Sequence, residues 1–123
     1  MKILFADDKT RKYCFDLKAA MKLFGGNKDL ARSLHARINA LEQAETLMDI
    51  IKTPSFYFHN LRKKGKRDLH GYYAIAVKTK RESWRIILRP LDENEDPFIG
   101  DTIDQIAATV EIVEITEVSD HYE

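Results

Sequence analysis

The chain has 123 residues, of which 44% are apolar and 33% charged, so it is long enough for one globular domain and is neither fibrous nor disordered. No apolar stretch is long enough to cross a bilayer, and the single cysteine excludes an internal disulfide, so we expect a cytoplasmic protein. The net charge is zero, but residues 1–89 hold all 20 Lys and Arg with nine acidic residues, whereas residues 90–123 hold 11 acidic residues and no basic one.

This charge distribution bears on the class of partner. A strongly positive surface attracts polyanions such as nucleic acids and speeds their capture. Charge alone also fits a solvated basic face beside an acidic loop that binds nothing. The two interpretations stay open until particular residues are considered.

The first part of the chain predicts a strand followed by a helical hairpin. Residues 2–6 (KILFA) suit a short strand, and Asp7 or Asp8 can cap the helix that follows. Gly25-Gly26 ends this helix, because glycine readily adopts the left-handed conformation found at helix ends. The apolar residues of the helix recur at helical spacing: Tyr13, Leu17, Met21 and Phe24.

A second helix begins after Asn27. Its apolar stripe can pack against a sheet and consists of Leu30, Leu34, Ile38 and Leu41. Thr46 and Asp49 form the pattern of a capping box, which opens one further helical turn. Thr53-Pro54 ends that turn, since the residue before a proline avoids the helical conformation.

The second half of the chain predicts antiparallel strands. We place them at residues 56–61, 71–77, 83–89 and roughly 107–118. In SWRIILRP the side chains alternate, so Trp84, Ile86 and Leu88 point to the core and Arg85, Ile87 and Arg89 to the opposite face. Pro90 closes this strand, and the last strand lacks a clean alternation, which favours a bulge or bend.

Two loops carry concentrated charge. The loop after FYFHNL holds Arg62, Lys63, Lys64, Lys66 and Arg67, close to His59. Residues 91–105 (LDENEDPFIGDTIDQ) form a long acidic loop, and loops of that length usually have a function of their own or are mobile.

Three stretches carry a resemblance to a known family: FHNLRKKGKRDLHGYYAIAV, SWRIILRP and the terminal SDHY. With the order of elements, they resemble the RelE/ParE superfamily of bacterial toxins, and most of all the HigB toxins of type II toxin–antitoxin pairs. The resemblance spans the whole chain, residues 1–123, as one domain. It implies an α+β fold in which an N-terminal strand and a helical hairpin pack on a mainly antiparallel four-stranded sheet.

The resemblance also implies an activity. HigB-like toxins are similar to ribosome-dependent endoribonucleases that cut messenger RNA and so inhibit translation and growth. The RNA supplies its own nucleophile, the 2′-hydroxyl, so this chemistry requires neither a metal nor a cofactor. The implied partners are the ribosome, mRNA and a HigA-like helix-turn-helix antitoxin in a hetero-oligomer, with no membrane.

The residues that match the family's motifs are the expected site. His59 matches the histidine of a His-x-Leu segment, and Arg85 matches the arginine of Trp-Arg. The terminal Asp-His-Tyr stands where the family has Asp-Tyr-His, so the separate roles of the last two residues stay open. The expected catalytic residues are His59, Arg85, Asp120, His121 and Tyr122, and the expected RNA-binding residues are Arg62, Lys63, Lys64, Lys66, Arg67 and Arg89.

Each residue type suits a step of RNA cleavage. His59 and His121 are candidates for the base and the acid, because imidazole titrates near neutrality. A guanidinium such as that of Arg85 can clamp two phosphate oxygens. Asp120 can orient an imidazole or accept a proton, and Tyr122 can donate a proton or stack on a base.

Three other interpretations fit the same residues. A ParE-like protein with this fold would inhibit DNA gyrase without cutting nucleic acid, and a toxin-like binding module would only dock RNA or a protein. A lone histidine such as His59 is also often a structural hydrogen-bonding group. The acidic loop would be repelled by ribosomal RNA, so it faces away from the site or contacts a basic patch on the antitoxin.

Overall fold

The computed structural model describes residues 1–61 and 67–122, and its longest helix begins where the sequence predicts. Helix α3 (Lys28–Gln43) starts after Asn27, whose side chain accepts a hydrogen bond from the backbone N–H of Leu30 at 3.1 Å. The apolar stripe of this helix is fully buried. A short helix, α4 (Leu47–Ile51), opens with the predicted capping box.

The first arm of the predicted hairpin is two helices rather than one. Helix α1 (Asp8–Phe15) ends at Asp16, whose backbone is extended, and α2 (Leu17–Leu23) begins directly after it. The Asp16 carboxylate accepts hydrogen bonds from the backbone N–H groups of Lys18 and Ala19, at 2.9 and 3.3 Å. Aspartate favours such a capping position over a helix interior, which explains the break.

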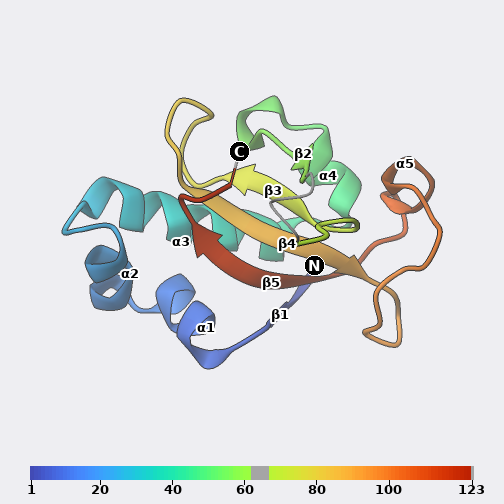
Figure 1. Cartoon of the computed structure of the whole chain (residues 1–123), viewed down its shortest axis with the longest axis horizontal. Helices are drawn as coiled ribbons and strands as arrows, with labels where there is room; N and C mark the ends of the chain where they lie inside the picture. The colour runs from blue at the N-terminus through green and yellow to red at the C-terminus, as the bar shows by residue number, and fades with distance from the viewer. Residues whose placement is uncertain (62–66, 123) are drawn as a thin grey trace.

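The sheet has five strands and is mixed, so the predicted four-stranded sheet was wrong, whereas the α+β class is confirmed. The strands are β1 (Lys2–Phe5), β2 (His59–Asn60), β3 (Tyr73–Ala76), β4 (Arg85–Leu91) and β5 (Ile112–Ser119). They lie in the order β1-β5-β4-β3-β2, and β1 runs parallel to β5 while the other pairs are antiparallel (Figure 1). The N-terminal strand therefore belongs to the sheet, because its backbone groups find partners along the free edge of β5.

Several strand boundaries differ from the prediction; the last strand, for example, begins at Ile112 and not near residue 107. A 3-10 turn (Pro54–Phe56) and Tyr57, with a φ of 53°, take up the start of the predicted strand, so β2 is only two residues long. Strand β4 continues through Pro90 to Leu91, so the predicted stop at Pro90 was wrong. Proline is tolerated there because pairing with β3 ends at Leu88, which leaves β4 an edge on that side.

The predicted irregularity in the last strand is confirmed as a bulge. Ile87 of β4 pairs with Glu117, but the next residue, Leu88, pairs with Ile115, so Thr116 is an extra residue in β5. The acidic segment before β5 is not structureless, because it contains a short helix, α5 (Ile103–Ile106).

The helices cover one face of the sheet. The main core joins Leu34 and Ile38 of α3 to residues of the sheet such as Ile75, Ile86 and Val113. In Figure 1, α3 runs behind the sheet, α1 and α2 lie beside it at the lower left, and the C-terminal end of the chain lies on the side of the viewer. Within residues 1–61 and 67–122, no helix has both the length and the apolar character that crossing a membrane requires.

Candidate functional site: the open face of the sheet

The sheet face opposite the helices carries most of the expected site residues that the structure describes. One row crosses four strands at directly paired positions, His59 with Ala74, Ala74 with Ile87, and Ile87 with Glu117. Paired residues project to the same face, and neighbouring strands lie about 4.8 Å apart, so the row spans about 14 Å. We call this surface the open face.

The hydrogen bond of His59 identifies which ring nitrogen carries the proton. Its Nδ1 lies 2.8 Å from the backbone oxygen of Tyr57, and a carbonyl oxygen can only accept. In the neutral ring Nδ1 therefore holds the hydrogen and Nε2 is an acceptor. Nε2 is shielded from solvent and has no hydrogen-bond partner among the described residues. A hydroxyl group that donated to Nε2 would remove the free-energy cost of this unpaired atom.

Tyr57 is a part of the site that the sequence analysis missed. The centroid of its ring lies 4.4 Å from the centroid of the His59 ring. The Cζ atom of Arg85 lies 5.2 Å from the centroid of the same tyrosine ring. The backbone of Tyr57 is left-handed, which costs a non-glycine residue free energy of order 1 kcal/mol. In the sequence, Pro54 indicates a turn here, but it does not predict that Tyr57 contacts His59 and Arg85.

Arg85 is held by the backbone of a neighbouring loop. The side chain donates hydrogen bonds to the carbonyl oxygens of Lys80, Glu82 and Trp84, and the residue is only 5% exposed. Burial lowers the pKa of its guanidinium. In this geometry the Arg85 side chain contacts the loop carbonyls and the ring of Tyr57 rather than facing solvent. Its expected role as a phosphate clamp stays a prediction.

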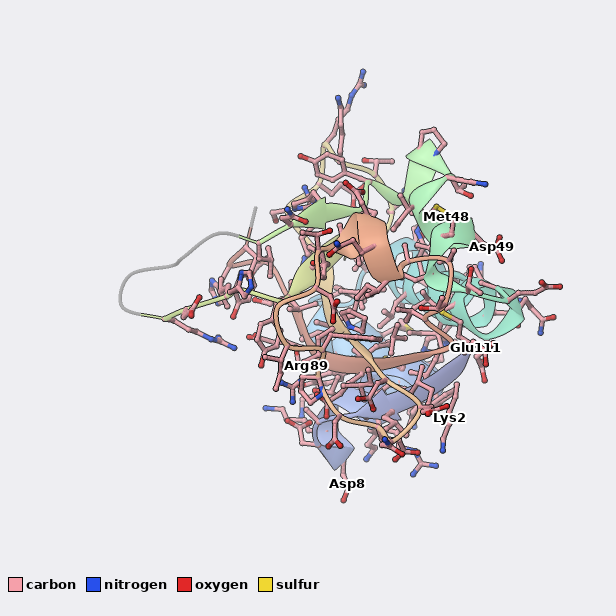
Figure 2. All side chains as sticks on the ribbon, turned by 90° about the vertical axis from the view of Figure 1, so that its right-hand side faces the viewer. Lys2, Asp8, Met48, Asp49, Arg89 and Glu111 are labelled. Atoms are coloured by element: carbon pink, nitrogen blue, oxygen red, sulfur yellow. The ribbon has the colours of Figure 1, made fainter. Side chains whose placement is uncertain are left out.

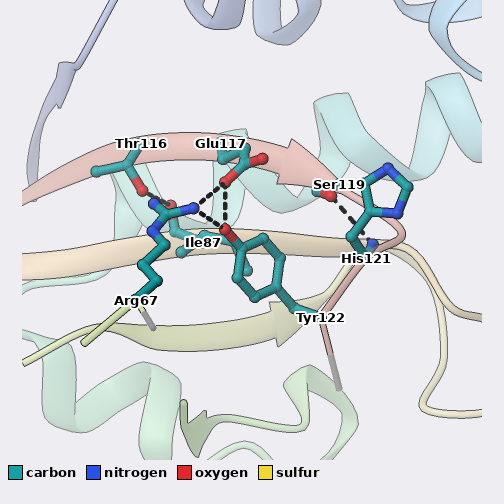
Figure 3. Close-up of polar contacts among 7 residues, drawn as sticks. All are labelled: Arg67, Ile87, Thr116, Glu117, Ser119, His121 and Tyr122. Carbon is teal, nitrogen blue, oxygen red and sulfur yellow. Dashed lines mark hydrogen bonds and ion pairs between the residues drawn. The ribbon is translucent and has the colours of Figure 1, made fainter. Parts of the chain in front are cut away.

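Tyr122 lies on the open face in a three-residue cluster with Arg67 and Glu117. Its hydroxyl donates to Glu117 Oε2 at 2.8 Å and accepts a hydrogen bond from Arg67, and Arg67 Nη1 lies 3.8 Å from the same carboxylate (Figure 3). Burial and the bond to Glu117 raise the pKa of Tyr122, so the phenol keeps its proton near neutral pH. The sequence analysis missed Glu117, because the bulge that orients it is not visible as a regular alternation.

The neighbouring His121 is oriented differently. Its side chain is 78% exposed, and its Nε2 lies 3.6 Å from the Asp120 carboxylate. In Figure 3 the imidazole of His121 points away from the cluster that Tyr122 joins. The structure thus brings Tyr122, and not the Asp120–His121 pair, onto the centre of the open face.

The expected RNA-binding residues divide into two groups. Arg89 lies on the open face, where its Nε donates to Glu114 at 2.7 Å and its guanidinium lies over the ring of Tyr72. Among the described arginines of the open face Arg67 is the most exposed, with a side chain 54% exposed against 30% for Arg89. The other four expected residues, Arg62, Lys63, Lys64 and Lys66, lie outside the described residues.

The described part of the chain offers no ready metal site, since no three His, Cys, Asp or Glu side chains within it lie close enough to hold an ion. Searches of the chain against protein-family models, curated proteins and solved structures find no match. The resemblance to RelE/ParE toxins therefore stays a prediction, and any function has to be argued from the open face.

Proposed function

We propose that this protein is the toxin of a type II toxin–antitoxin pair, which cuts messenger RNA on the ribosome in the cytoplasm. The observation that carries the proposal is His59, whose Nε2 is an acceptor without a described partner on the sheet face that also holds Arg67 and Tyr122. Because Nε2 is shielded in the free protein, the proposal requires that the docking RNA opens access to it. The implied antitoxin is a HigA-like helix-turn-helix protein that forms a hetero-oligomer with the chain.

The chemistry follows from what RNA provides. His59 Nε2 accepts the proton of the 2′-hydroxyl, whose oxygen attacks the adjacent phosphorus and forms the O2′–P bond. The P–O5′ bond breaks, and the departing 5′-oxygen takes up a proton, which leaves a 2′,3′-cyclic phosphate and a 5′-hydroxyl. The ring of His59 is suited to the first step because its other nitrogen is held by the Tyr57 carbonyl.

In this proposal the cluster of Arg67, Glu117 and Tyr122 stabilises the charge of the phosphorane and donates the proton to the departing oxygen. Arg67 is exposed enough to contact a phosphate, and a guanidinium stabilises the extra negative charge of the phosphorane. The Tyr122 phenol keeps its proton near neutral pH and is the candidate donor; Arg67 beside it offsets only part of the effect of burial and of Glu117, which raise its pKa. His121 is the alternative donor, so its role and that of Tyr122 stay open.

The test supplies the purified protein to translating ribosomes and maps new mRNA 5′ ends. The informative variant is His59→Asn, because asparagine keeps a donor for the Tyr57 carbonyl but has no atom at the Nε2 position. We expect cleavage to fall roughly 100- to 10,000-fold, the usual contribution of a proton-transfer group, with binding of a single-stranded RNA nearly unchanged. Circular dichroism and urea unfolding check that the variant is folded.

Two results would count against the proposal. Wild-type protein that produces no new 5′ ends, while a known ribosome-dependent nuclease does, would remove the enzymatic function. Growth arrest that His59→Asn retains would favour a gyrase inhibitor, because blocking gyrase by binding needs no proton acceptor. The hypothesis of gyrase inhibition would then be tested by supercoiling assays with the wild-type and His59→Asn proteins.

A further inference from the structure

A cleft lies at one end of the open face, between the sheet and the acidic segment that precedes β5. Its volume is about 530 Å³, which is within the range of sites that bind ligands or anchor side chains. Arg89 of β4 and Tyr72, just before β3, form part of its wall, and the acidic segment contributes Phe98, Asp101 and Asp104. Figure 2 looks onto this end of the molecule, with α5 facing the viewer.

The acidic segment is held in a defined shape. The Asp92 side chain accepts hydrogen bonds from the backbone N–H groups of Asn94 and Asp96, and Leu91 forms a β-bridge with Pro97. A capping box between Thr102 and Gln105 fixes the start of α5. A surface that is ordered before binding loses less conformational entropy when a partner docks.

The rim of the cleft exposes an apolar side chain to water. Ile99 is 93% exposed, the highest value among the large apolar residues of the described chain, and it lines the cleft with the half-buried Phe98. Single exposed apolar residues are common on protein surfaces. Here the isoleucine stands beside an apolar hollow, which is the arrangement that protein–protein contacts use.

The charge of the cleft decides what fits it. The carboxylates of Asp101 and Asp104 form no hydrogen bond or ion pair with any described residue. The one arginine in the wall, Arg89, is already paired with Glu114 at 2.7 Å. Burial, together with the negative charge of Asp104, raises the pKa of Tyr73, another residue of the cleft. The local field is therefore negative and favours a cation.

We propose that this cleft binds a lysine- or arginine-rich segment of a partner protein, which inserts an apolar side chain beside Phe98 and Ile99 and places its cationic groups at Asp101 and Asp104. RNA is the less favoured occupant, because the same carboxylates repel phosphates. The inference does not depend on the nuclease activity, since it rests on the shape, the exposed apolar surface and the charge of the cleft itself.

The experiment uses a fluorescent lysine-rich peptide with a leucine–phenylalanine anchor. A second peptide of equal charge has both apolar residues replaced by serine, and a third has glutamate in place of lysine. We expect the first peptide alone to bind well, and its addition to shift the amide NMR signals of Ile99, Thr102 and Ile103. Asp101→Asn with Asp104→Asn should weaken binding about 5- to 30-fold, as the loss of two exposed ion pairs implies.

A matched variant separates the cleft from general electrostatic attraction. Glu93→Gln with Glu111→Gln removes the same charge from the same acidic part of the chain, but these residues line a different hollow. In Figure 2, Glu111 lies well apart from Arg89, which marks the wall of the cleft. We expect this variant to change the affinity for the first peptide by less than about twofold at moderate salt concentration.

Several results would overturn the inference. Equal weakening by the two double variants, or equal binding of the serine peptide, would show a non-specific electrostatic contact. Shifts of the same amides by a single-stranded RNA, and not by the peptide, would assign the cleft to nucleic acid. Sedimentation experiments test whether the chain self-associates. Self-association that Asp101→Asn with Asp104→Asn abolishes, and that the peptide does not inhibit, would assign the cleft to a second copy of the chain.

Discussion

Arg85 and Arg67 lie on the same face of the sheet, yet their guanidinium groups have different surroundings. Arg85 is buried and donates to carbonyl oxygens of the loop between β3 and β4. Arg67 is half exposed and contacts two side chains, Tyr122 and Glu117. Hydrogen bonds to a buried charged group contribute more to stability than exposed ion pairs do. The two arginines are therefore expected to respond differently to substitution.

The first prediction compares these two residues. Arg85→Ala should lower the free energy of unfolding by about 1–3 kcal/mol, because it removes a buried side chain that donates hydrogen bonds to carbonyl oxygens of the β3–β4 loop. Arg67→Ala should lower it by less than about 1 kcal/mol but weaken binding of single-stranded RNA. Urea unfolding and fluorescence anisotropy measure the two quantities. A stable Arg85→Ala protein that no longer binds RNA would instead make Arg85 a phosphate ligand.

Cys14 provides a prediction about pH. The residue is 2% exposed in the helical layer, and burial raises the pKa of its thiol from 9.0 to about 12. The folded protein therefore keeps a proton that the unfolded chain releases. Its contribution to stability is complete below pH 9 and is lost as the pH rises towards 12.

The test compares wild-type protein with Cys14→Ala under reducing conditions. Between neutral pH and about pH 10.5 the wild type should lose roughly 2 kcal/mol more stability than the variant, at about 1.4 kcal/mol per pH unit above 9. The buried tyrosines also titrate at high pH, but they are common to both proteins and cancel in the difference. Parallel pH curves for the two proteins would contradict the assignment.

At the scale of elements, the bulge in β5 determines which side chains reach the open face. The extra residue Thr116 interrupts the alternation between Ile115, which is buried in the main core, and Glu117, which faces Ile87. In a regular strand Ile115 and Glu117, which are two residues apart, would project to the same face. The bulge therefore places Glu117 on the open face, opposite to Ile115, and adds local twist.

Deletion of single residues tests this interpretation of β5. Removing Thr116 should leave a regular strand and change the free energy of unfolding by only about 1 kcal/mol. Removing Ile115 also regularises the strand but places threonine in the core, so it should cost about 2–4 kcal/mol. Similar losses for the two deletions, measured by urea unfolding, would mean that the bulge itself stabilises the fold.

At the scale of the whole molecule, the net charge is zero, but the two parts of the chain carry opposite charges. Residues 1–89 have an excess of 11 positive charges, and residues 90–123 have 11 acidic residues and no Lys or Arg. The acidic segment borders the open face at Arg89 and Tyr72. A bound RNA strand is therefore expected to run from the centre of the open face away from α5, because phosphates avoid the carboxylates.

The salt dependence of RNA binding tests the expected role of the basic loop. If Arg62, Lys63, Lys64, Lys66 and Arg67 all contact phosphates, log K should fall with log salt concentration with a slope of about −3.5. Replacing Lys63, Lys64 and Lys66 by glutamine should reduce the slope by about 2. An unchanged slope in this variant would mean that the loop does not contact the RNA backbone.

Much of the local structure follows from the sequence by itself. The caps at Asp7, Asn27 and Thr46, the helical stripe of α3 and the two faces of β4 are all visible in residue types and spacing. They are predictable because each depends on hydrogen bonds or periodicity within a few residues. The same local rules place His59, Arg85 and Arg89 on or next to one face of a sheet.

Only the tertiary structure decided how distant segments meet. It paired β1 with β5, brought Tyr57 against His59 and Arg85, and joined Arg67 to Glu117 and Tyr122. It also showed that the guanidinium of Arg85 donates its hydrogen bonds to carbonyl oxygens of the β3–β4 loop. These contacts depend on which backbone and side-chain groups find partners across the sheet, and that choice is made by the packing of the whole chain rather than by neighbours in sequence.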